Sequence, residues 1–226
     1  MNTNLESIIP LLNKNLKIIQ RSDYFNFSID SLLISEFVNI QKNTKKILDL
    51  GTGNAAIPLF LSKKTSARIY GIEIQEISYN LALKNININN LNDQIYIIYD
   101  NMKNYLKYFN KGFFDIIISN PPYMDDNGKK INENEHKAIS RHEIKLSLSE
   151  LISNAKRLLK PIGLLFFIHR THRLVEIIKA LDKNNFSVKK IIFIYSARNN
   201  KSTMVFVEAI KGKKVKLEIQ NYYIYH

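Results

Sequence analysis

Cysteine is absent from the 226 residues of this sequence, and its five histidines are scattered. Without cysteine there are no disulfide bonds, thiolate metal sites or thiol nucleophiles, and the scattered histidines predict no metal centre. No apolar run approaches the ~20 residues that a membrane-spanning helix needs. Residues 1–6 lack the basic flank and following apolar run of a leader sequence. We therefore expect a soluble cytoplasmic protein with neither a membrane nor a metal partner.

Acidic side chains are in the minority, because 20 Asp and Glu accompany 33 Lys and Arg and leave a net charge of +13. An excess of this size attracts polyanions, since binding releases their counterions. The charge therefore favours RNA or DNA as a partner. The abundance of Lys, Asn and Ile along the whole chain leaves a purely compositional origin open.

The chain length and a hydrophobic content of 45% suit a single domain with a substantial core. From residue 46 to about 196, strand-like runs alternate with segments of helical length, which is the α/β pattern. Strands are predicted at 46–50, 67–72, 94–99, 113–119, 162–169, 187–195 and 203–209. Helices are predicted at about 30–40, 55–63, 75–88, 101–109, 142–159 and 172–184. We expect an N-terminal helical segment at 1–45, a catalytic core at 46–210 and a basic, aromatic tail at 211–226. The tail could bind RNA or could equally form a packed terminal strand.

The connection between the last two predicted strands is short. It runs only from Ser196 to Ser202, too few residues for the crossover that a parallel pair needs, so an antiparallel hairpin is expected. The predicted fold is a Rossmann-like, mostly parallel sheet of seven strands with this hairpin at its end. Residues 124–140 are polar and form the longest segment without a predicted element. A loop of this kind is either a flap over a functional site or a solvated excursion.

Residues 51–56, with the sequence GTGNAA, follow the first core strand and fit the pattern G-x-G-x-x-G/A. The glycines allow a tight turn and close approach of the backbone to a nucleotide-like cofactor. Glu73 ends the next strand, 22 residues after Gly51, where a carboxylate can accept hydrogen bonds from a ribose. An exposed strand-end charge is the alternative for Glu73. The pattern alone does not separate nicotinamide dinucleotides from S-adenosylmethionine, because both contain an adenosine ribose.

The third strand ends at Asp100 and is followed by Met102. The Asp100 carboxylate can accept from an adenine amino group, and the Met102 side chain can pack on the ring. Asp100 can equally cap the helix predicted after it.

A second motif, Asn120-Pro121-Pro122-Tyr123, follows the strand predicted at 113–119. Two successive prolines fix the backbone and remove two N–H donors, so the turn presents acceptors only. The Asn120 side-chain oxygen and the Pro121 carbonyl can then receive the two hydrogens of a planar amino group, while Tyr123 stacks on its base. An ordinary strand-ending turn is the alternative, since Asn and Pro both favour turns.

Together the two motifs resemble those of the class I S-adenosylmethionine-dependent methyltransferases, over residues 23–210. The chain is most similar to the bacterial tRNA (adenine-N6)-methyltransferases that modify the adenine 3′ of the anticodon in a valine tRNA. Residues 25–33 and 138–143 carry this closer likeness. The resemblance implies S-adenosylmethionine as cofactor, tRNA as substrate and a monomeric enzyme.

The resemblance also implies roles for individual residues. The catalytic motif is Asn120, Pro121, Pro122 and Tyr123. The expected cofactor-binding residues are Asp30, Asp49, Gly51, Thr52, Gly53, Asn54, Glu73, Ile74, Asp100, Asn101 and Met102. Independently of the resemblance, charge and position near one predicted sheet edge make six residues candidates for phosphate contacts with RNA. They are Arg141, His142, Arg170, Arg173, Arg198 and Lys201, for each of which a solvated surface charge is the alternative.

Other functions remain open from the sequence. A release-factor glutamine presents the same planar amino group, and guanine N2 methylation of ribosomal RNA is a third possibility. Methylation of cytosine C5 is disfavoured because its covalent nucleophile is usually Cys. A catalytically silent RNA-binding protein with this fold is a fourth reading, against which the intact motifs argue.

Overall fold

The computed structural model describes residues 5–11, 15–24, 28–121, 147–196 and 201–224. Its strands are β1 (Glu6–Leu11), β2 (Leu16–Arg21), β3 (Lys46–Leu50), β4 (Arg68–Glu73), β5 (Ile95–Tyr99), β6 (Phe114–Ser119), β7 (Leu159–Arg170), β8 (Phe186–Ser196), β9 (Met204–Lys211) and β10 (Glu218–Ile224). Its α-helices are α1 (Ile29–Phe37), α2 (Ala56–Ser62), α3 (Glu76–Ile88), α5 (Leu148–Leu158) and α6 (Leu174–Lys183). Two 3-10 helices are η1 (Met102–Lys107) and η2 (Thr171–Arg173). None of the described helices combines the length and apolar character needed to cross a membrane.

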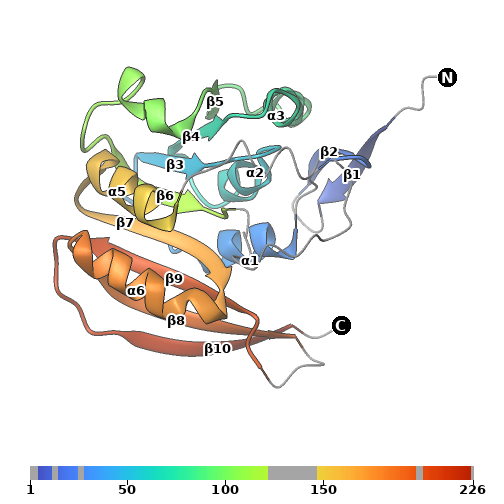
Figure 1. Ribbon diagram of the computed structural model, residues 1–226. Coiled ribbons are helices and arrows are strands. Elements are labelled where there is room, and N and C mark those ends of the chain that lie inside the picture. Colours follow the sequence, from blue (N-terminus) through green and yellow to red (C-terminus); the bar gives the residue numbers. More distant parts are fainter. Residues whose placement is uncertain (1–4, 12–14, 25–27, 122–146, 197–200, 225–226) are drawn as a thin grey trace.

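The main sheet has the strand order β10-β8-β9-β7-β6-β3-β4-β5 (Figure 1). Strand β9 runs antiparallel to both of its neighbours, and every other adjacent pair is parallel. The predicted mixed α/β sheet and its antiparallel β8–β9 hairpin are therefore confirmed. The sheet nevertheless has eight described strands where seven were expected. The eighth is β10, which arises from the aromatic tail and pairs with β8.

Aromatic packing explains why the tail becomes a strand. The ring of Tyr223 stacks on Tyr195 of β8 with centroids 5.0 Å apart, and Tyr222 packs edge-on against Phe37 of α1 at 5.0 Å. Cross-strand aromatic pairs of this kind stabilise strand pairing.

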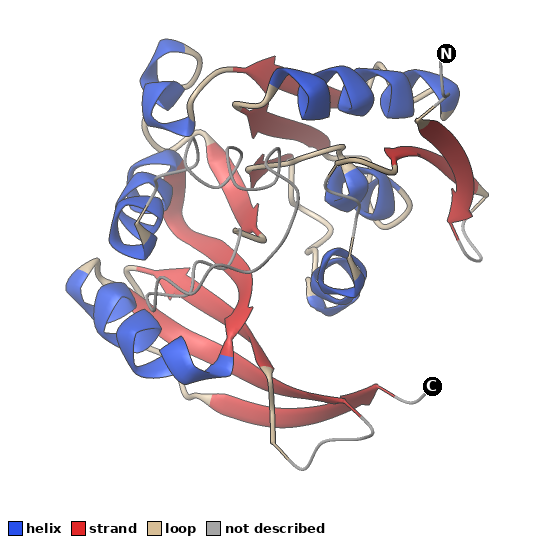
Figure 2. Cartoon of the chain, turned by 45° about the vertical axis from the view of Figure 1, so that its right-hand side comes forward, coloured by secondary structure: helices blue, strands red, loops and turns tan. Residues whose placement is uncertain are grey.

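Alternating side chains divide the core into two layers, one on each face of the sheet. In β6, Ile116 and Ile118 pack on the side of α1 and α2, whereas Ile117 packs on the side of α5 and α6. This period of two is that of a strand buried on both faces, as parallel sheets require. Helices consequently cover both faces, as Figure 2 shows.

The N-terminal segment corrects the prediction of a helical region at 1–45. Residues 6–11 and 16–21 pair as the antiparallel strands β1 and β2, called the N-terminal hairpin below, and the helix expected at about 30–40 is present as α1. The β-branched pairs Ile8-Ile9 and Ile18-Ile19 favour strands, and Ile18 is fully buried.

Two smaller differences from the predicted elements concern local geometry. The helix expected at 101–109 is the 3-10 helix η1, and β7 begins at Leu159, earlier than expected, beside a β-bulge.

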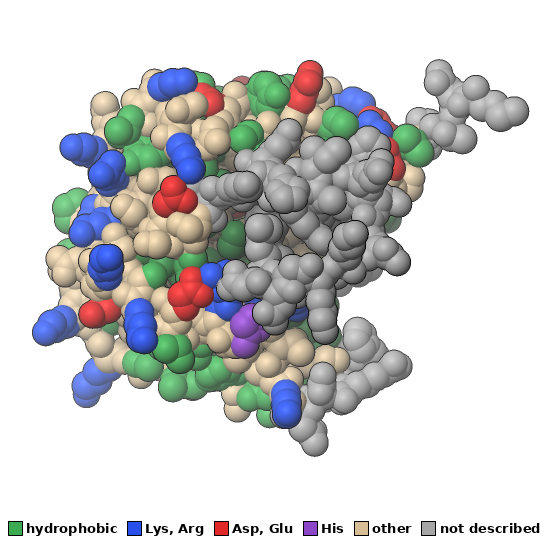
Figure 3. Space-filling view, in the orientation of Figure 1, with side chains coloured by type: hydrophobic (Ala, Val, Ile, Leu, Met, Phe, Trp, Pro, Cys, Tyr) green, Lys and Arg blue, Asp and Glu red, His purple; other side chains and the backbone are tan. Residues whose placement is uncertain are grey.

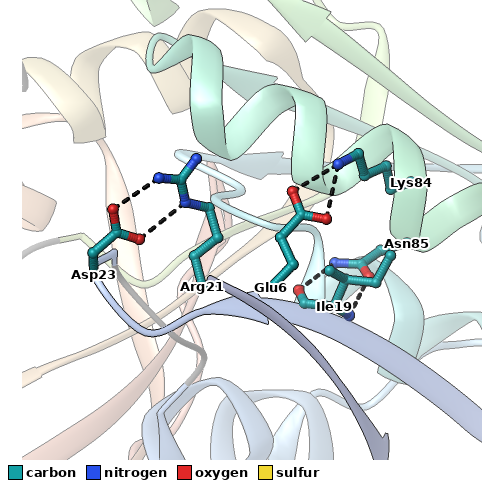
Figure 4. Close-up of polar contacts among 6 residues, drawn as sticks. All are labelled: Glu6, Ile19, Arg21, Asp23, Lys84 and Asn85. Atoms are coloured by element: carbon teal, nitrogen blue, oxygen red, sulfur yellow. Dashed lines mark hydrogen bonds and ion pairs between the residues drawn. The ribbon is translucent and has the colours of Figure 1, made fainter. Parts of the chain in front are cut away.

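Helix α3 holds the hairpin through two asparagines one turn apart (Figure 4 shows Asn85). The Asn85 Oδ1 accepts from the Ile19 N–H at 2.5 Å, and its Nδ2 donates to the Ile19 carbonyl at 3.2 Å. Asn89 makes the same pair of bonds with Lys17, at 2.9 and 2.7 Å. The two amides therefore bond the backbone N–H and C=O groups of β2 as a neighbouring strand would. Lys84 of α3 adds an ion pair with Glu6 of β1.

Replacing Asn85 with alanine is expected to lower the free energy of unfolding by at least ~2 kcal/mol. The side chain is fully buried, and its loss leaves the N–H and C=O of Ile19 without partners; such buried groups cost ~1–3 kcal/mol each. Denaturant unfolding followed by circular dichroism measures the change. Asn80→Ala, at an exposed position of the same helix, is the control and should change stability little.

Candidate active site

The predicted site residues meet where the chain reverses its direction across the sheet. From β3 the chain proceeds through β4 to β5, and then returns to the other side of β3 with β6 and β7. In open α/β sheets ligands bind at such a switch point, beyond the carboxyl ends of the strands. Both sequence motifs begin there, one directly after β3 and the other directly after β6.

The turn after β3 has the conformation that its glycines permit. Gly51, Gly53 and Ala55 have φ values of 74°, 58° and 66°, so every second residue is left-handed. Only glycine adopts this region without strain, and Ala55 is the exception, fully buried at the start of α2. The N–H groups of Gly51 and Thr52 both donate to the Ile72 carbonyl, which fastens the turn to β4.

Asp49 is the penultimate residue of β3, just before this turn, and is fully buried. Its Oδ2 accepts from the Thr52 hydroxyl at 2.8 Å, while its Oδ1 has no partner within the described part of the chain. Burial raises the pKa of Asp49 to about 7, and the charge of Glu73 acts in the same direction, whereas the Thr52 bond opposes it. The site thus contains a carboxylate with one oxygen available to a donor.

Glu73 is buried, which corrects the alternative of an exposed strand-end charge. Its Oε2 accepts from the Gly53 N–H and its Oε1 from the Gln75 N–H, each at 2.8 Å. Burial raises the pKa of Glu73, and these backbone bonds lower it. One carboxylate therefore fixes the glycine turn and the start of α3 together. The donors to Asp49 and Glu73 are all neutral, so both carboxylates suit a ligand that carries positive charge.

Asp100 follows β5 and accepts three hydrogen bonds. Its Oδ1 accepts from Asn101 N–H and Asn104 Nδ2, both at 2.6 Å, and its Oδ2 accepts from the Tyr108 hydroxyl at 2.7 Å. These bonds, of which the Asn104 bond contributes most, lower the pKa of Asp100 to about 2. The residue that caps η1 is Asn101, whose side chain accepts from the Lys103 N–H, and so the capping alternative for Asp100 is wrong. The Lys107 Nζ lies 3.7 Å from the Asp100 Oδ2 and forms an ion pair with it.

Met102 of η1 lies against the glycine turn, and Asp30 belongs to a helix that packs on α2. A Cβ added at Gly51 would lie 3.8 Å from the Met102 Cε, so Met102 lies against the turn. Asp30 lies in the first turn of α1. Helix α1 packs against α2, which begins at the glycine turn.

Asn120 of the second motif is half-buried and is oriented by a residue that the sequence analysis did not select. Its Nδ2 donates to the hydroxyl of Ser31 in α1 at 3.3 Å. This bond holds the Asn120 amide against the start of α1. Ser119, directly before it, donates from its hydroxyl to the Leu50 carbonyl at 2.9 Å and ties β6 to β3. Pro121 is described, and Pro122 and Tyr123 lie outside the described residues.

His169 is a second residue that sequence reasoning missed. The β6–β7 register pairs Ser119 with Phe167, so continuing it by two residues places His169 alongside Pro121. The ring is 3% exposed, and its Nδ1 accepts from the Arg170 N–H at 2.8 Å. Burial, followed by the charge of Arg173, lowers the pKa of His169 to about 4, so the ring is neutral at pH 7. In the sequence, His169 is marked only by its place at the end of the apolar run 164–168.

The proposed RNA-binding residues are only partly placed. Arg170 is exposed at the end of β7, Lys201 is exposed just before β9, and Arg173 is half-buried in η2. The guanidinium of Arg173 forms two bonds with Glu176, which reduces its value as a phosphate ligand. Arg141, His142, Arg198 and residues 124–140 lie outside the described residues.

The sequence profile of the methyltransferase small domain matches residues 28–191. The chain belongs to the methyltransferase small domain family. The matched range includes α1, both motifs and the strands from β3 to β7. The predicted likeness to methyltransferases is therefore confirmed.

Relatives of this methyltransferase domain include enzymes with a tRNA-modifying name. The tRNA1(Val) (adenine(37)-N6)-methyltransferase of Bacteroides fragilis is 30% identical over 134 residues, which are 59% of this chain and 55% of that protein. An enzyme of the same name from Aliivibrio salmonicida is 25% identical over 182 residues, or 80% and 75% of the two chains. The chain thus matches little more than half the length of the first of these relatives.

Solved structures share the fold of the methyltransferase domain. A methyltransferase from Pyrococcus furiosus superposes with a TM-score of 0.65 at 21% identity, covering 89% of this chain and 92% of its own. A predicted O-methyltransferase from Agrobacterium tumefaciens has a TM-score of 0.68 at 20% identity, covering 87% and 88%. The Rossmann-like fold class predicted from the sequence is confirmed by these neighbours.

Proposed function

We propose that this protein transfers a methyl group from S-adenosylmethionine to the N6 amino group of an adenine in tRNA. The observation that carries the proposal is the orientation of Asn120 beyond the carboxyl end of β6, next to a cofactor-type turn after β3. The names of the relatives favour adenine 37 of a valine tRNA as the target. The net charge of +13 suits an RNA substrate.

The residues around the glycine turn fit S-adenosylmethionine. Asp49 offers an oxygen without a described partner, and Glu73 has lone pairs beyond those used by Gly53 and Gln75. When bound, this cofactor supplies a methyl group on a positively charged sulfur that leaves as a neutral thioether. Asp49 and Glu73 would attract its positive charge and its ribose, and Met102 would flank the adenine. The remaining residues assigned to this role are Asp30, Gly51, Thr52, Gly53, Asn54, Ile74, Asp100 and Asn101.

Asn120 and Pro121 would act on the target amine. An adenine amine is a poor nucleophile because its lone pair is delocalised into the ring. Acceptors at Asn120 Oδ1 and the Pro121 carbonyl would draw its two hydrogens out of the ring plane and leave the lone pair directed at the methyl group. The nitrogen then loses a proton to water, so a strong general base is unnecessary. Positioning is the main contribution, a class of effect that reaches ~7–11 kcal/mol.

Cofactor affinity is expected to rise about ten-fold between pH 6 and pH 8 because of Asp49. A carboxyl group with a pKa of about 7 is mostly protonated at pH 6 and mostly ionised at pH 8. Only the ionised form attracts a cation, so affinity rises with pH, and binding below pH 7 releases a proton. Calorimetry in buffers of different ionisation enthalpy measures both quantities. In Asp49→Asn protein the affinity should be lower and independent of pH over this range; an unchanged profile would assign the titration to another group.

The proposal is tested by transfer of labelled methyl from S-adenosylmethionine to unmodified total tRNA, followed by nucleoside analysis. Release factor and ribosomal RNA are assayed in parallel. N6-methyladenosine in tRNA alone supports the proposal. Label in the release factor would identify a glutamine methyltransferase instead, N2-methylguanosine in ribosomal RNA would identify the third candidate, and absence of label from every substrate would contradict the proposal.

A further inference from the structure

A pocket lies at the end of the sheet opposite to the candidate active site. Its volume is about 500 Å³, and it is lined by residues that precede β6 and β8, the beginning of β7, the end of β9 and the C-terminal half of α5. Strand β6 has six residues, and at ~3.3 Å per residue it separates this pocket from Asn120 by ~20 Å. The pocket and the candidate active site therefore share no residue.

Four cationic side chains line the pocket, namely Lys111, Lys156, Arg157 and Lys211. They come from three separate parts of the chain: the loop before β6, helix α5 and strand β9. None of the described lining residues is acidic, and Ser153 and Asn184 add neutral polar groups. Figure 3 shows Lys and Arg side chains gathered along the left-hand edge of the molecule, where the parallel strands begin.

The surroundings of Lys211 disfavour the charged form of its side chain. Its ammonium group donates to the Leu159 carbonyl inside the pocket. Burial, followed by the charge of Lys156, lowers the pKa of Lys211. A bound anion would offset both effects, since it replaces lost solvation and screens the two like charges.

Helix ends explain only part of the cluster. Lys156 and Arg157 lie in the last turn of α5, where cations interact favourably with the helix dipole. Lys111 and Lys211, however, belong to no helix. The Arg157 carbonyl at this helix end is already bonded to the Gly112 N–H at 2.9 Å. Neutralisation of helix ends therefore does not account for all four charges.

We propose that this pocket binds a small phosphorylated ligand that carries at least two negative charges, such as a diphosphate. The planar fork of Arg157 suits two phosphate oxygens, and the lysines supply point charges around it. Ser153 can donate from its hydroxyl. A concave pocket of this size favours a compact ligand over a continuous RNA backbone.

Calorimetric titration with inorganic pyrophosphate at low ionic strength tests the proposal on the whole chain. The wild-type protein should show saturable binding at one site, and Lys156→Gln should weaken it about ten-fold or more. Lys179→Gln removes the same charge from an exposed position of α6 outside the pocket, and its affinity should equal that of the wild type. Absence of saturable binding, or equal weakening in both variants, would overturn the proposal.

Thermal unfolding gives a second, independent readout. Pyrophosphate should raise the Tm of the wild-type and Lys179→Gln proteins clearly and that of Lys156→Gln much less, each relative to the same protein without pyrophosphate. An equal rise in all three proteins would overturn the proposal. Displacement of pyrophosphate by unmodified tRNA would overturn the assignment to a small ligand, since the pocket would then belong to an RNA-binding surface.

Discussion

Asn120→Ala protein is expected to transfer methyl groups at least about 100-fold more slowly than the wild type, while its affinity for S-adenosylmethionine stays unchanged. The substitution removes one of the two acceptors proposed for the target amine. Loss of a single well-placed polar group at a reacting centre typically costs 10²–10³ in kcat. Asn120 lies after β6, whereas Asp49, Glu73 and Asp100 lie at the carboxyl ends of β3, β4 and β5. Single-turnover transfer and calorimetry measure the two quantities separately.

The exposed Asn110 provides the matched control for Asn120. Asn110→Ala makes the same chemical change at a position ahead of β6, ten residues before Asn120, and should leave kcat and affinity at wild-type values. Ser31→Ala removes the hydroxyl that accepts from Asn120 Nδ2 and should lower kcat by a smaller factor, since the amide is loosened but retained. Wild-type kcat in Asn120→Ala protein would rule out the proposed mechanism.

Glu73→Ala protein is expected to lose at least about 100-fold in affinity for S-adenosylmethionine and to be less stable than the wild type. The buried carboxylate accepts from Gly53 and Gln75, so its removal leaves two N–H groups without partners at ~1–3 kcal/mol each. It also removes the proposed ribose acceptor and frees the glycine turn from α3. Two different losses thus follow from one substitution.

Separating these losses requires two measurements and one control. Denaturant unfolding reports the stability of Glu73→Ala protein, and calorimetry under conditions where the protein is fully folded reports its affinity. Glu76→Ala replaces an exposed glutamate in the first turn of α3 and should change affinity little. If Glu73→Ala binds the cofactor as tightly as the wild type, the carboxylate is structural only.

The sequence predicted the sheet well because its signals are local and strong. Strands β3, β4, β5 and β6 are short runs of Ile, Leu and Phe bounded by Gly, Asp and Asn, and the predicted ranges agree within a residue or two. For the tail the sequence left RNA binding and a packed terminal strand equally open, and the structure shows the strand, β10. Its residues are mostly exposed, so it has little apolar alternation, and its pairing depends on aromatic contacts with Tyr195 and Phe37. Those partners are remote in sequence, and no local pattern reveals them.

The site was predictable in its positions but less so in its contacts. The glycine turn, Glu73 and Asn120 follow strands whose order in an α/β sheet can be anticipated. The burial of Glu73 between Gly53 and Gln75 and the bond from Asn120 to Ser31 depend on how distant segments pack. Ser31 lies 89 residues from Asn120 in sequence, so only the folded chain brings them together.

The amide of Asn85 also connects the N-terminal hairpin to the glycine turn. Besides holding Ile19, its Nδ2 donates to the Asn54 carbonyl in the glycine turn at 2.9 Å. One side chain therefore shares its hydrogen bonds between the N-terminal hairpin and the proposed cofactor loop. Ordering of that loop by a ligand should slow hydrogen exchange at the Ile19 amide, because the two sites are thermodynamically linked. Hydrogen exchange in the N-terminal hairpin would therefore report whether a ligand is bound at the glycine turn, although β1 and β2 form a separate sheet.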